Sequence, residues 1–255
     1  MSVLVDRDGP VTIVTIDRPA RRNAVDPDTA AALRDAFTTF AADDCARVAI
    51  LTGREGHFCA GFDLNAVGSS RYDPDGPGPM GPTRMLLDKP VIAAVEGHAV
   101  AGGLELALWC DLRVAAASAV FGVYCRRWGV PLIDGGTVRL PRIVGQGRAL
   151  DMILTGRPVE AQEAHHIGLA DRVVADGEAL PAAIELAKQI AAFPQLCMTS
   201  DRLSAYRQWD FDLAGALAHE ARAGVAPLRE GAAAGAKRFT DGEGRNGSFA
   251  ALQRE

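Results

Sequence analysis

The segment "EGHAVAGGLELALWCDLRVA", residues 96–115, decides the fold. It follows the apolar strand predicted at 91–97, continues as a short apolar helix over about 102–110, and leads into a second strand at 112–118. Two consecutive glycines, Gly102 and Gly103, stand directly before the helix. Strands that alternate with helices and are apolar along their whole length predict a sheet covered on both faces.

Glu105 interrupts the apolar run Leu104–Cys110 of this segment. Burying an ionised carboxylate among apolar side chains is costly, so an inward-facing Glu105 should have a raised pKa. A raised carboxyl pKa suits proton transfer near neutral pH. The alternative is a solvent-facing glutamate in the first helical turn, where the helix dipole favours it.

The segment "TGREGHFCAGFDL", residues 52–64, places small residues between Phe58 and Phe62. After Gly61, the backbone N–H of Phe62 can point outward while the two rings hold the loop. Gly102 lets a ligand approach the N–H at the start of the helix, with the positive end of the dipole behind it. Two such donors that converge on one oxygen would form an oxyanion hole.

Strand and helix patterns alternate on both sides of these segments. Residues 3–9 and 11–19 predict a hairpin, and Asp26-Pro27 begins a helix as N-cap and first helical residue. Further strands are predicted at 47–53 and 120–123 and a helix at about 146–154, whereas the chain from about 160 onward is almost all helical. Residues 66–82 are rich in Gly, Pro and Ser and predict a mobile loop, which is either a surface connection or a lid or pocket wall.

The composition excludes several classes of protein. The chain has 255 residues, is 48% hydrophobic and carries a formal charge of −5, without a basic run that could track phosphates. No apolar stretch is long enough to span a membrane, and the N-terminus does not read as a signal peptide. Five scattered cysteines and no HExxH predict free thiols in the cytoplasm and no metal site.

Three segments in the same order resemble the crotonase, or enoyl-CoA hydratase/isomerase, superfamily. They are "TGREGHFCAGFDL", "GHAVAGGLELALWCDLRVA" and "FGVYCRRWGVPLIDGGTVRLPRIVGQGRALDMILTG", and the resemblance extends from "VTIVTIDRPARRNAVD" to "EGAAAGAKRF". It implies an α/β fold with a spiral of β-β-α units over residues 1–195. It also implies a C-terminal helical region, 196–255, that packs in trimers or dimers of trimers.

The resemblance implies an acyl-CoA thioester as substrate. The N–H groups of Phe62 and Gly102 match the oxyanion-hole positions of the superfamily, and Glu105 matches the first catalytic glutamate of the hydratases. Arg21 and Arg22 match a basic spot near the CoA phosphates, although a solvated charged turn would look the same. The remaining residues along which CoA would lie are Ala60, Asp63, Leu64 and Asn65, together with Phe62 and Gly102.

The sequence departs from the hydratase pattern at the second catalytic glutamate. Counting four residues on from Phe121 gives Cys125, so that acid is absent. Cys125 is either small apolar filler or a nucleophile whose pKa is lowered by Arg126 and Arg127. Asp134 lies one position after the place where some isomerases and dehalogenases of the superfamily carry an aspartate. It is either an acid/base or a residue of a plain turn or N-cap.

Three functions remain open at this point. The first is hydration or double-bond isomerisation of an enoyl-CoA with Glu105 as acid/base, and the second is another enolate reaction such as thioester hydrolysis, dehalogenation or decarboxylation. The third is a non-catalytic acyl-CoA binder, which would have no use for Glu105. No cofactor is expected beyond the coenzyme A of the substrate, and no nucleic acid or membrane partner is expected. No GxGxxG follows a strand and no GxSxG occurs.

Overall fold

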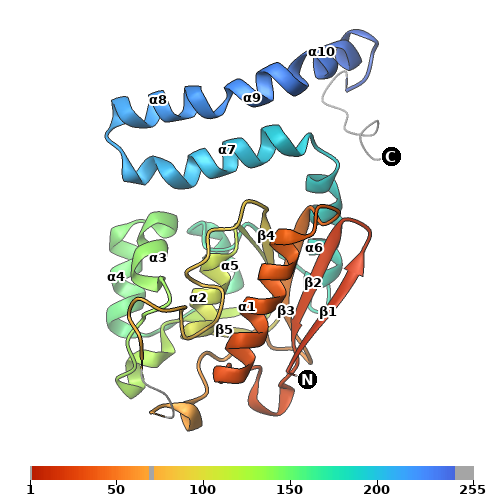
Figure 1. Ribbon diagram of the computed structural model, residues 1–255. Coiled ribbons are helices and arrows are strands. Elements are labelled where there is room, and N and C mark those ends of the chain that lie inside the picture. Colours follow the sequence, from red (N-terminus) through yellow and green to blue (C-terminus); the bar gives the residue numbers. More distant parts are fainter. Residues whose placement is uncertain (1, 69–71, 245–255) are drawn as a thin grey trace. The chain divides into compact units, whose positions relative to one another are not determined.

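The first two strands form the predicted hairpin in the computed structural model, which describes residues 2–68 and 72–244 (Figure 1). Strand β1 (Val3–Asp8) pairs antiparallel with β2 (Val11–Ile16), from Val3 opposite Ile16 to Asp8 opposite Val11. Gly9 has φ +58°, the left-handed conformation that this tight turn requires. The hairpin forms one edge of the main sheet.

Four further strands extend this sheet in parallel. They are β3 (Val48–Gly53), β4 (Val91–Val95), β6 (Leu112–Ala116) and β9 (Arg172–Val174), in the order β1-β2-β3-β4-β6-β9. Every residue of β4 is buried, as expected for a parallel strand covered on both faces. The sheet brings the ends of β3 and β4 together, and the chain leaves these ends toward the two glycine-rich segments.

A small second sheet lies beside the start of the glycine-rich helix. Strands β5 (His98–Val100), β7 (Val120–Gly122) and β8 (Pro158–Glu160) are ordered β5-β7-β8, with β5 and β7 parallel. An isolated parallel bridge joins Cys59 to Ala99. The bridge ties the segment after β3 to β5, so the segments that carry the candidate N–H donors lie side by side.

Two helices frame the site. Helix α1 (Pro27–Ala42) begins as predicted, because the Asp26 side chain accepts a hydrogen bond from the N–H of Thr29. Helix α2 (Gly102–Trp109) is buried along its whole length. The rings of Phe37 on α1 and Trp109 on α2 meet edge to face, with centroids 4.7 Å apart. This contact fixes α2 against the helix that lines the opposite wall of the site.

Several elements are shorter or more numerous than predicted. The prediction that the chain is almost all helical from about residue 160 is wrong at β9, because a three-residue strand leaves little periodicity to detect. Helix α3 (Gly136–Val144) was not predicted from the sequence.

The remaining elements up to residue 191 are η1 (Pro19–Arg21), η2 (Leu64–Ala66), η3 (Tyr124–Trp128), α4 (Gln146–Thr155), α5 (Ala161–His166) and α6 (Ala179–Ala191).

The contacts divide the chain into two units, Met1–Ala187 and Lys188–Glu255. The second unit contains α7 (Gln195–Arg207), η4 (Gln208–Asp210), α8 (Leu213–Ala223), α9 (Val225–Pro227), η5 (Leu228–Ala232) and α10 (Ala233–Thr240). The end of the helical region predicted at 196–255 lies outside the described residues, which stop at 244. Among the described residues, no helix is long and apolar enough to cross a membrane.

Candidate active site

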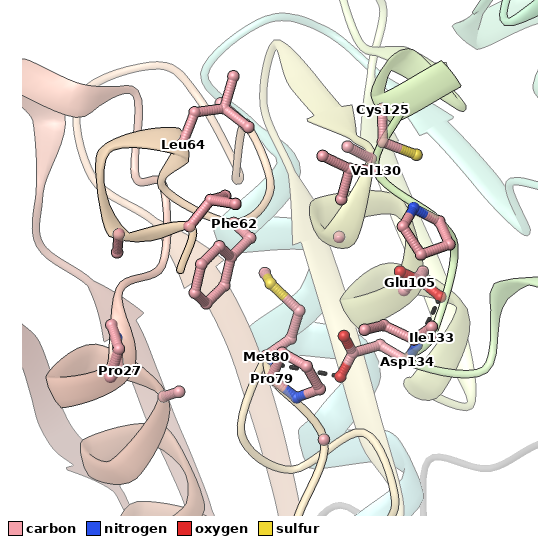
Figure 2. A pocket seen from close by; sticks show the side chains of 18 of the residues that line it. Pro27, Phe62, Leu64, Pro79, Met80, Glu105, Cys125, Val130, Ile133 and Asp134 are labelled. Carbon is pink, nitrogen blue, oxygen red and sulfur yellow. Dashed lines mark hydrogen bonds between the residues drawn. The ribbon is translucent and has the colours of Figure 1, made fainter. Parts of the chain in front are cut away.

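A cavity of about 680 Å³ opens within the first unit. Figure 2 shows Phe62 and Leu64 on one side of it and Glu105, Cys125 and Asp134 on the facing side, with Met80 between them. Its walls come from α1, residues 60–68, residues 72–80, the start of α2, and residues 124–134. Most of the described residues of the Gly/Pro-rich segment 66–82 therefore line the cavity, in agreement with its predicted role as a pocket wall. Residues 69–71 lie outside the described residues.

The two glycine-rich segments approach each other closely at the wall of the cavity. A Cβ on Gly61 would lie 3.1 Å from the backbone nitrogen of Gly102 and 2.9 Å from the Cβ of Ala101. Gly61 has φ +102°, a conformation that other residues rarely adopt. Both the close approach and the backbone conformation require glycine here, and together they bring the N–H groups of Phe62 and Gly102 into one region.

The backbone on either side of Phe62 sets the direction of its N–H. Val25 donates to the carbonyl of Gly61 and accepts from the N–H of Asp63. Because the C=O of Gly61 and the N–H of Phe62 belong to one trans peptide group and point in opposite directions, the N–H of Phe62 faces away from Val25. Across residues 2–68 and 72–244, this N–H has no hydrogen-bond partner, and Phe62 lines the cavity.

The start of α2 leaves a second N–H available. Ala101 has φ +54° and ψ −124°, a strained conformation for a residue with a side chain, and no side chain caps the helix. The first N–H groups of a helix have no partner within the helix. Within the described parts of the chain, the N–H of Gly102 has none, and Gly102 lines the cavity. Both Phe62 and Gly102 therefore line the cavity with N–H groups that have no partner among the described residues.

Glu105 lies on the first turn of α2 and is 2% exposed, so the solvent-facing alternative is wrong. Its Oε1 accepts hydrogen bonds from the N–H of Asp134 at 2.9 Å and of Gly136 at 2.8 Å. A Cβ at Gly136 would lie within 3.2 Å of this carboxyl group, which explains the glycine. Among the described residues the other oxygen, Oε2, has no hydrogen-bond partner, and Glu105 borders the cavity.

The surroundings of Glu105 raise the pKa of its carboxyl group from 4.5 to about 7. Burial is the largest cause, and the negative charge of Asp134 adds to it. The two backbone donors and Arg139 act in the opposite direction, because they stabilise the carboxylate. The group can therefore accept or give up a proton near neutral pH.

Asp134 is buried beside Glu105, but its bonded carboxyl oxygen points to another segment. Its Oδ1 accepts hydrogen bonds from the backbone N–H of Met80, at 3.0 Å, and from the hydroxyl of Thr83. Burial raises the pKa of Asp134, while Thr83, Met80 and nearby arginines lower it. The role of Asp134 as acid/base stays a prediction, because it lines the cavity yet already serves as an acceptor for residues 78–83.

Cys125 faces the same cavity from η3. Burial raises the pKa of its thiol, and the charge of Glu105 raises it further, despite the opposing effect of Arg126. The pKa of the thiol is therefore raised overall, and the net lowering predicted from Arg126 and Arg127 is wrong. Arg126 donates a hydrogen bond to the carbonyl oxygen of Ile153, and the guanidinium carbon of Arg127 lies 4.3 Å from the centre of the Tyr124 ring. Cys125 is a protonated, weakly polar wall residue at neutral pH.

The other predicted substrate-binding residues divide into two groups. Arg22, Ala60 and Leu64 line the cavity together with Phe62. Arg21, Asp63 and Asn65 are not among its lining residues: Asp63 forms an ion pair with Arg18 at 3.1 Å and accepts from the side chain of Asn65. Asp63 and Asn65 therefore hold the loop on which Phe62 and Leu64 stand.

Sequence reasoning missed several residues of the site. Met80 is fully buried, and a Cβ on Gly102 would lie 2.5 Å from its sulfur. His98 lines the cavity, with its Nδ1 3.3 Å from Nδ1 of His57. The glycines and prolines around Met80 were the only signal for this segment, and they gave no period from which its contacts could be predicted.

The fold agrees with comparisons with known proteins. A family profile described as enoyl-CoA hydratase/isomerase matches residues 6–226. The chain belongs to this family, and it is an enzyme of the enoyl-CoA hydratase/isomerase type.

Named relatives and solved structures are similar over most of the chain. Enoyl-CoA hydratase EchA19 of Mycobacterium tuberculosis is 43% identical over 201 residues, which are 74% of each chain. Carnitinyl-CoA dehydratase of Salmonella arizonae is 38% identical over 231 residues, covering 86% of this chain and 88% of the relative. The crystal structure of enoyl-CoA hydratase EchA1 from Mycobacterium marinum has a TM-score of 0.90 at 35% identity, covering 94% of this chain and 96% of that one.

Proposed function

We propose that the cavity binds the thioester end of an enoyl-CoA with the carbonyl oxygen between the N–H groups of Phe62 and Gly102. Negative charge that develops on this oxygen, as an enolate forms, would be stabilised by two fixed dipoles in a mostly apolar site. Removing one such donor from an oxyanion hole typically costs about 100- to 1,000-fold in turnover. The closeness of Gly61 to the nitrogen of Gly102 supports this arrangement.

Glu105 is the acid/base of the proposed reaction, and its position is the observation that carries the proposal. Its Oε1 is held by two backbone donors, and its pKa is raised to about 7. The remaining oxygen, which has no hydrogen-bond partner in the part of the chain that the structure describes, would activate water or move a proton at the substrate α-carbon. A group whose pKa lies near the working pH is the most effective proton carrier.

The proposed reaction is addition of water across a C2–C3 double bond, the reverse elimination of water from a 3-hydroxyacyl-CoA, or a shift of the double bond. The names of the relatives, an enoyl-CoA hydratase and a carnitinyl-CoA dehydratase, support the first pair. In hydration, the oxygen of water bonds to C3 and a proton adds to C2. With Cys125 where a second glutamate would be, the second proton transfer is left to Glu105 itself, to Asp134 or to water. We therefore expect slow hydration compared with an enzyme that has two glutamates.

The remaining features of the proposed enzyme follow the sequence predictions. Coenzyme A enters with the substrate, and we propose no further cofactor and no metal. Arg22 at the cavity is a candidate partner for the CoA phosphates. The five cysteines are all free, which suits a reducing cytoplasm. The trimer or dimer of trimers also remains a proposal.

A panel of acyl-CoA thioesters incubated with the enzyme and followed by mass spectrometry tests the proposed function. Hydration adds the mass of one water to a 2-enoyl-CoA, and isomerisation of a 3-enoyl-CoA leaves the mass unchanged but creates a new absorbing conjugated thioester. Hydrolysis, decarboxylation or dehalogenation would release free CoA, carbon dioxide or halide, and would replace the proposal with one of those reactions. Unchanged thioesters throughout the panel would contradict the proposal.

A further inference from the structure

Asp134 joins two walls of the cavity that lie far apart in the sequence. Its Oδ1 accepts from the N–H of Met80 and the hydroxyl of Thr83, both in the turn formed by residues 78–83. A Cβ on Gly78 would lie 2.4 Å from this same oxygen, so the turn is packed directly against the carboxyl group. Within the turn, the N–H of Gly81 donates to the carbonyl of Gly78 at 2.8 Å.

Arg139 makes a second connection between the same two segments. Its guanidinium donates to the carbonyl oxygen of Asp134 at 3.0 Å and to that of Thr83 at 2.6 Å. The side chain and the backbone of Asp134 are thus both bonded to the 78–83 turn, one directly and one through Arg139. Two independent links hold the turn against residue 134.

The two segments that Asp134 connects each contact a residue with a proposed role in the reaction. On one end, Met80 of the turn packs against Gly102, whose N–H is a proposed oxyanion donor. On the other end, the N–H of Asp134 donates to Oε1 of Glu105 (Figure 2). Asp134 is therefore hydrogen-bonded to Glu105 through its backbone N–H, and to Met80, which packs against Gly102, through its side chain.

We propose that Asp134 is a positioning residue, which keeps Glu105 and the 78–83 turn in fixed positions relative to the start of α2. This inference rests on the proposed role of Glu105. The carboxyl oxygen that is bonded to Met80 and Thr83 acts as a fixed acceptor, and it carries no proton to or from the substrate. Small misplacements of reacting groups can cost about 100-fold in rate, so such a brace has a measurable effect.

The charge of Asp134 adds a second effect that an uncharged acceptor would lack. Burial is the main cause of the raised pKa of Glu105, and the nearby carboxylate of Asp134 raises it further. The other charged or titratable groups that act on this pair are Arg139 beside both, Arg84 beside Asp134, and the Cys125 thiol beside Glu105. Removing the charge at residue 134 should therefore lower the pKa of Glu105.

Two substitutions at residue 134 separate the effect of its hydrogen-bond acceptor from the effect of its negative charge. Asp134→Asn keeps an oxygen that can accept from Met80 and Thr83 but removes the charge, whereas Asp134→Ala removes both. We expect Asp134→Ala to lower kcat/KM for crotonyl-CoA by about 10- to 100-fold, and Asp134→Asn to recover most of this loss. Thr83→Ala, which removes one of the two donors and keeps the charge, should change kcat/KM in the same direction as Asp134→Ala.

The titration of Glu105 supplies a readout that does not depend on turnover. In protein labelled with ¹³C at the glutamate carboxyl carbons, the Glu105 signal is assigned by its absence from Glu105→Gln. Its midpoint should lie near pH 7 in the wild type and at lower pH in Asp134→Asn. Asp88→Asn, the same change at an exposed position away from the cavity, should leave the midpoint in place.

Two results would overturn the inference. A midpoint that does not move in Asp134→Asn would show that residue 134 does not act on Glu105. A loss of kcat in Asp134→Asn as large as that in Glu105→Gln, at every pH, would show that Asp134 itself transfers a proton. If the midpoint moves but the wild type converts no enoyl-CoA, the link between the two residues stands and the proposed function fails.

Discussion

Gly61 and Gly102, about forty residues apart in the sequence, are in contact: a Cβ on Gly61 would lie 3.1 Å from the backbone nitrogen of Gly102. The contact depends on β5, which is bridged to Cys59 on one side and leads into α2 on the other. It brings together the two N–H groups that the proposed mechanism requires. Position 61 requires glycine because its φ is positive, and a side chain at either position 61 or position 102 would collide with neighbouring atoms.

Gly61→Ala is expected to damage this arrangement. The new methyl group would meet Ala101 at 2.9 Å and the nitrogen of Gly102 at 3.1 Å, in a residue with φ +102°. If the start of α2 shifts, one oxyanion donor is misplaced, and turnover should fall by about 100-fold. Gly56→Ala is the matched control, since Gly56 has φ +80° with no atom within 4 Å of its Cβ position. Equal turnover in the two variants would contradict the proposed role of Gly61.

The raised pKa of Glu105 should make the protein less stable as the pH rises. Between about pH 4.5 and 7, the folded state holds a proton that the unfolded state has lost, so stability decreases through this interval. A shift of this size corresponds to about 3 kcal/mol. Glu105→Gln keeps the acceptor oxygen and has no charge to bury.

Denaturant unfolding at pH 5 and pH 8 measures this effect. Relative to the wild type, Glu105→Gln should gain stability between the two pH values, by up to about 3 kcal/mol. Glu178→Gln, at an exposed position, serves as the control. A constant difference between Glu105→Gln and the wild type at both pH values would show that Glu105 does not titrate in the folded protein at the raised pKa.

The thiol at position 125 predicts weak hydration of crotonyl-CoA. A positioned acid or base typically contributes about 100- to 10,000-fold, and the raised pKa of Cys125 keeps this group protonated. Cys125→Glu should increase the hydration rate, whereas Cys125→Ser should not. Wild-type hydration with kcat/KM near about 10⁸ M⁻¹s⁻¹ would show that another group already replaces the second acid.

The helices of the second unit predict oligomers. Leu213, Leu217 and Leu228 are 78%, 57% and 69% exposed in the single chain, an arrangement that favours association. Light scattering at micromolar concentration should give a mass that is a multiple of three chains. A monomer under these conditions would contradict the prediction.

Local patterns in the sequence were sufficient to predict part of the site. Gly102 before an apolar run, Glu105 within it and Asp26-Pro27 before α1 each have a local physical meaning, and the structure places all three as predicted in the fold. The hairpin and the central strands were predictable for the same reason: their residues alternate or are continuously apolar over five or six positions.

The surroundings of Asp134 could not be predicted in this way. Its partners Met80 and Thr83 lie 54 and 51 residues earlier, in a segment whose glycines and prolines give no period. The sequence therefore left open whether Asp134 is an acid or a residue of a turn. The strand β9 was missed for a different reason, because its three residues gain their structure from pairing with β6.

The central claim is that Glu105 moves a proton at an enolate held by Phe62 and Gly102. Exchange of the α-protons of butyryl-CoA in D₂O tests this claim most directly. This saturated thioester cannot be hydrated, so deuterium at its α-carbon reports enolate formation alone. We predict that mass spectrometry finds deuterium incorporation with the wild type, and that Glu105→Gln binds butyryl-CoA but exchanges about 100-fold or more slowly. Exchange at the wild-type rate in Glu105→Gln would contradict the account.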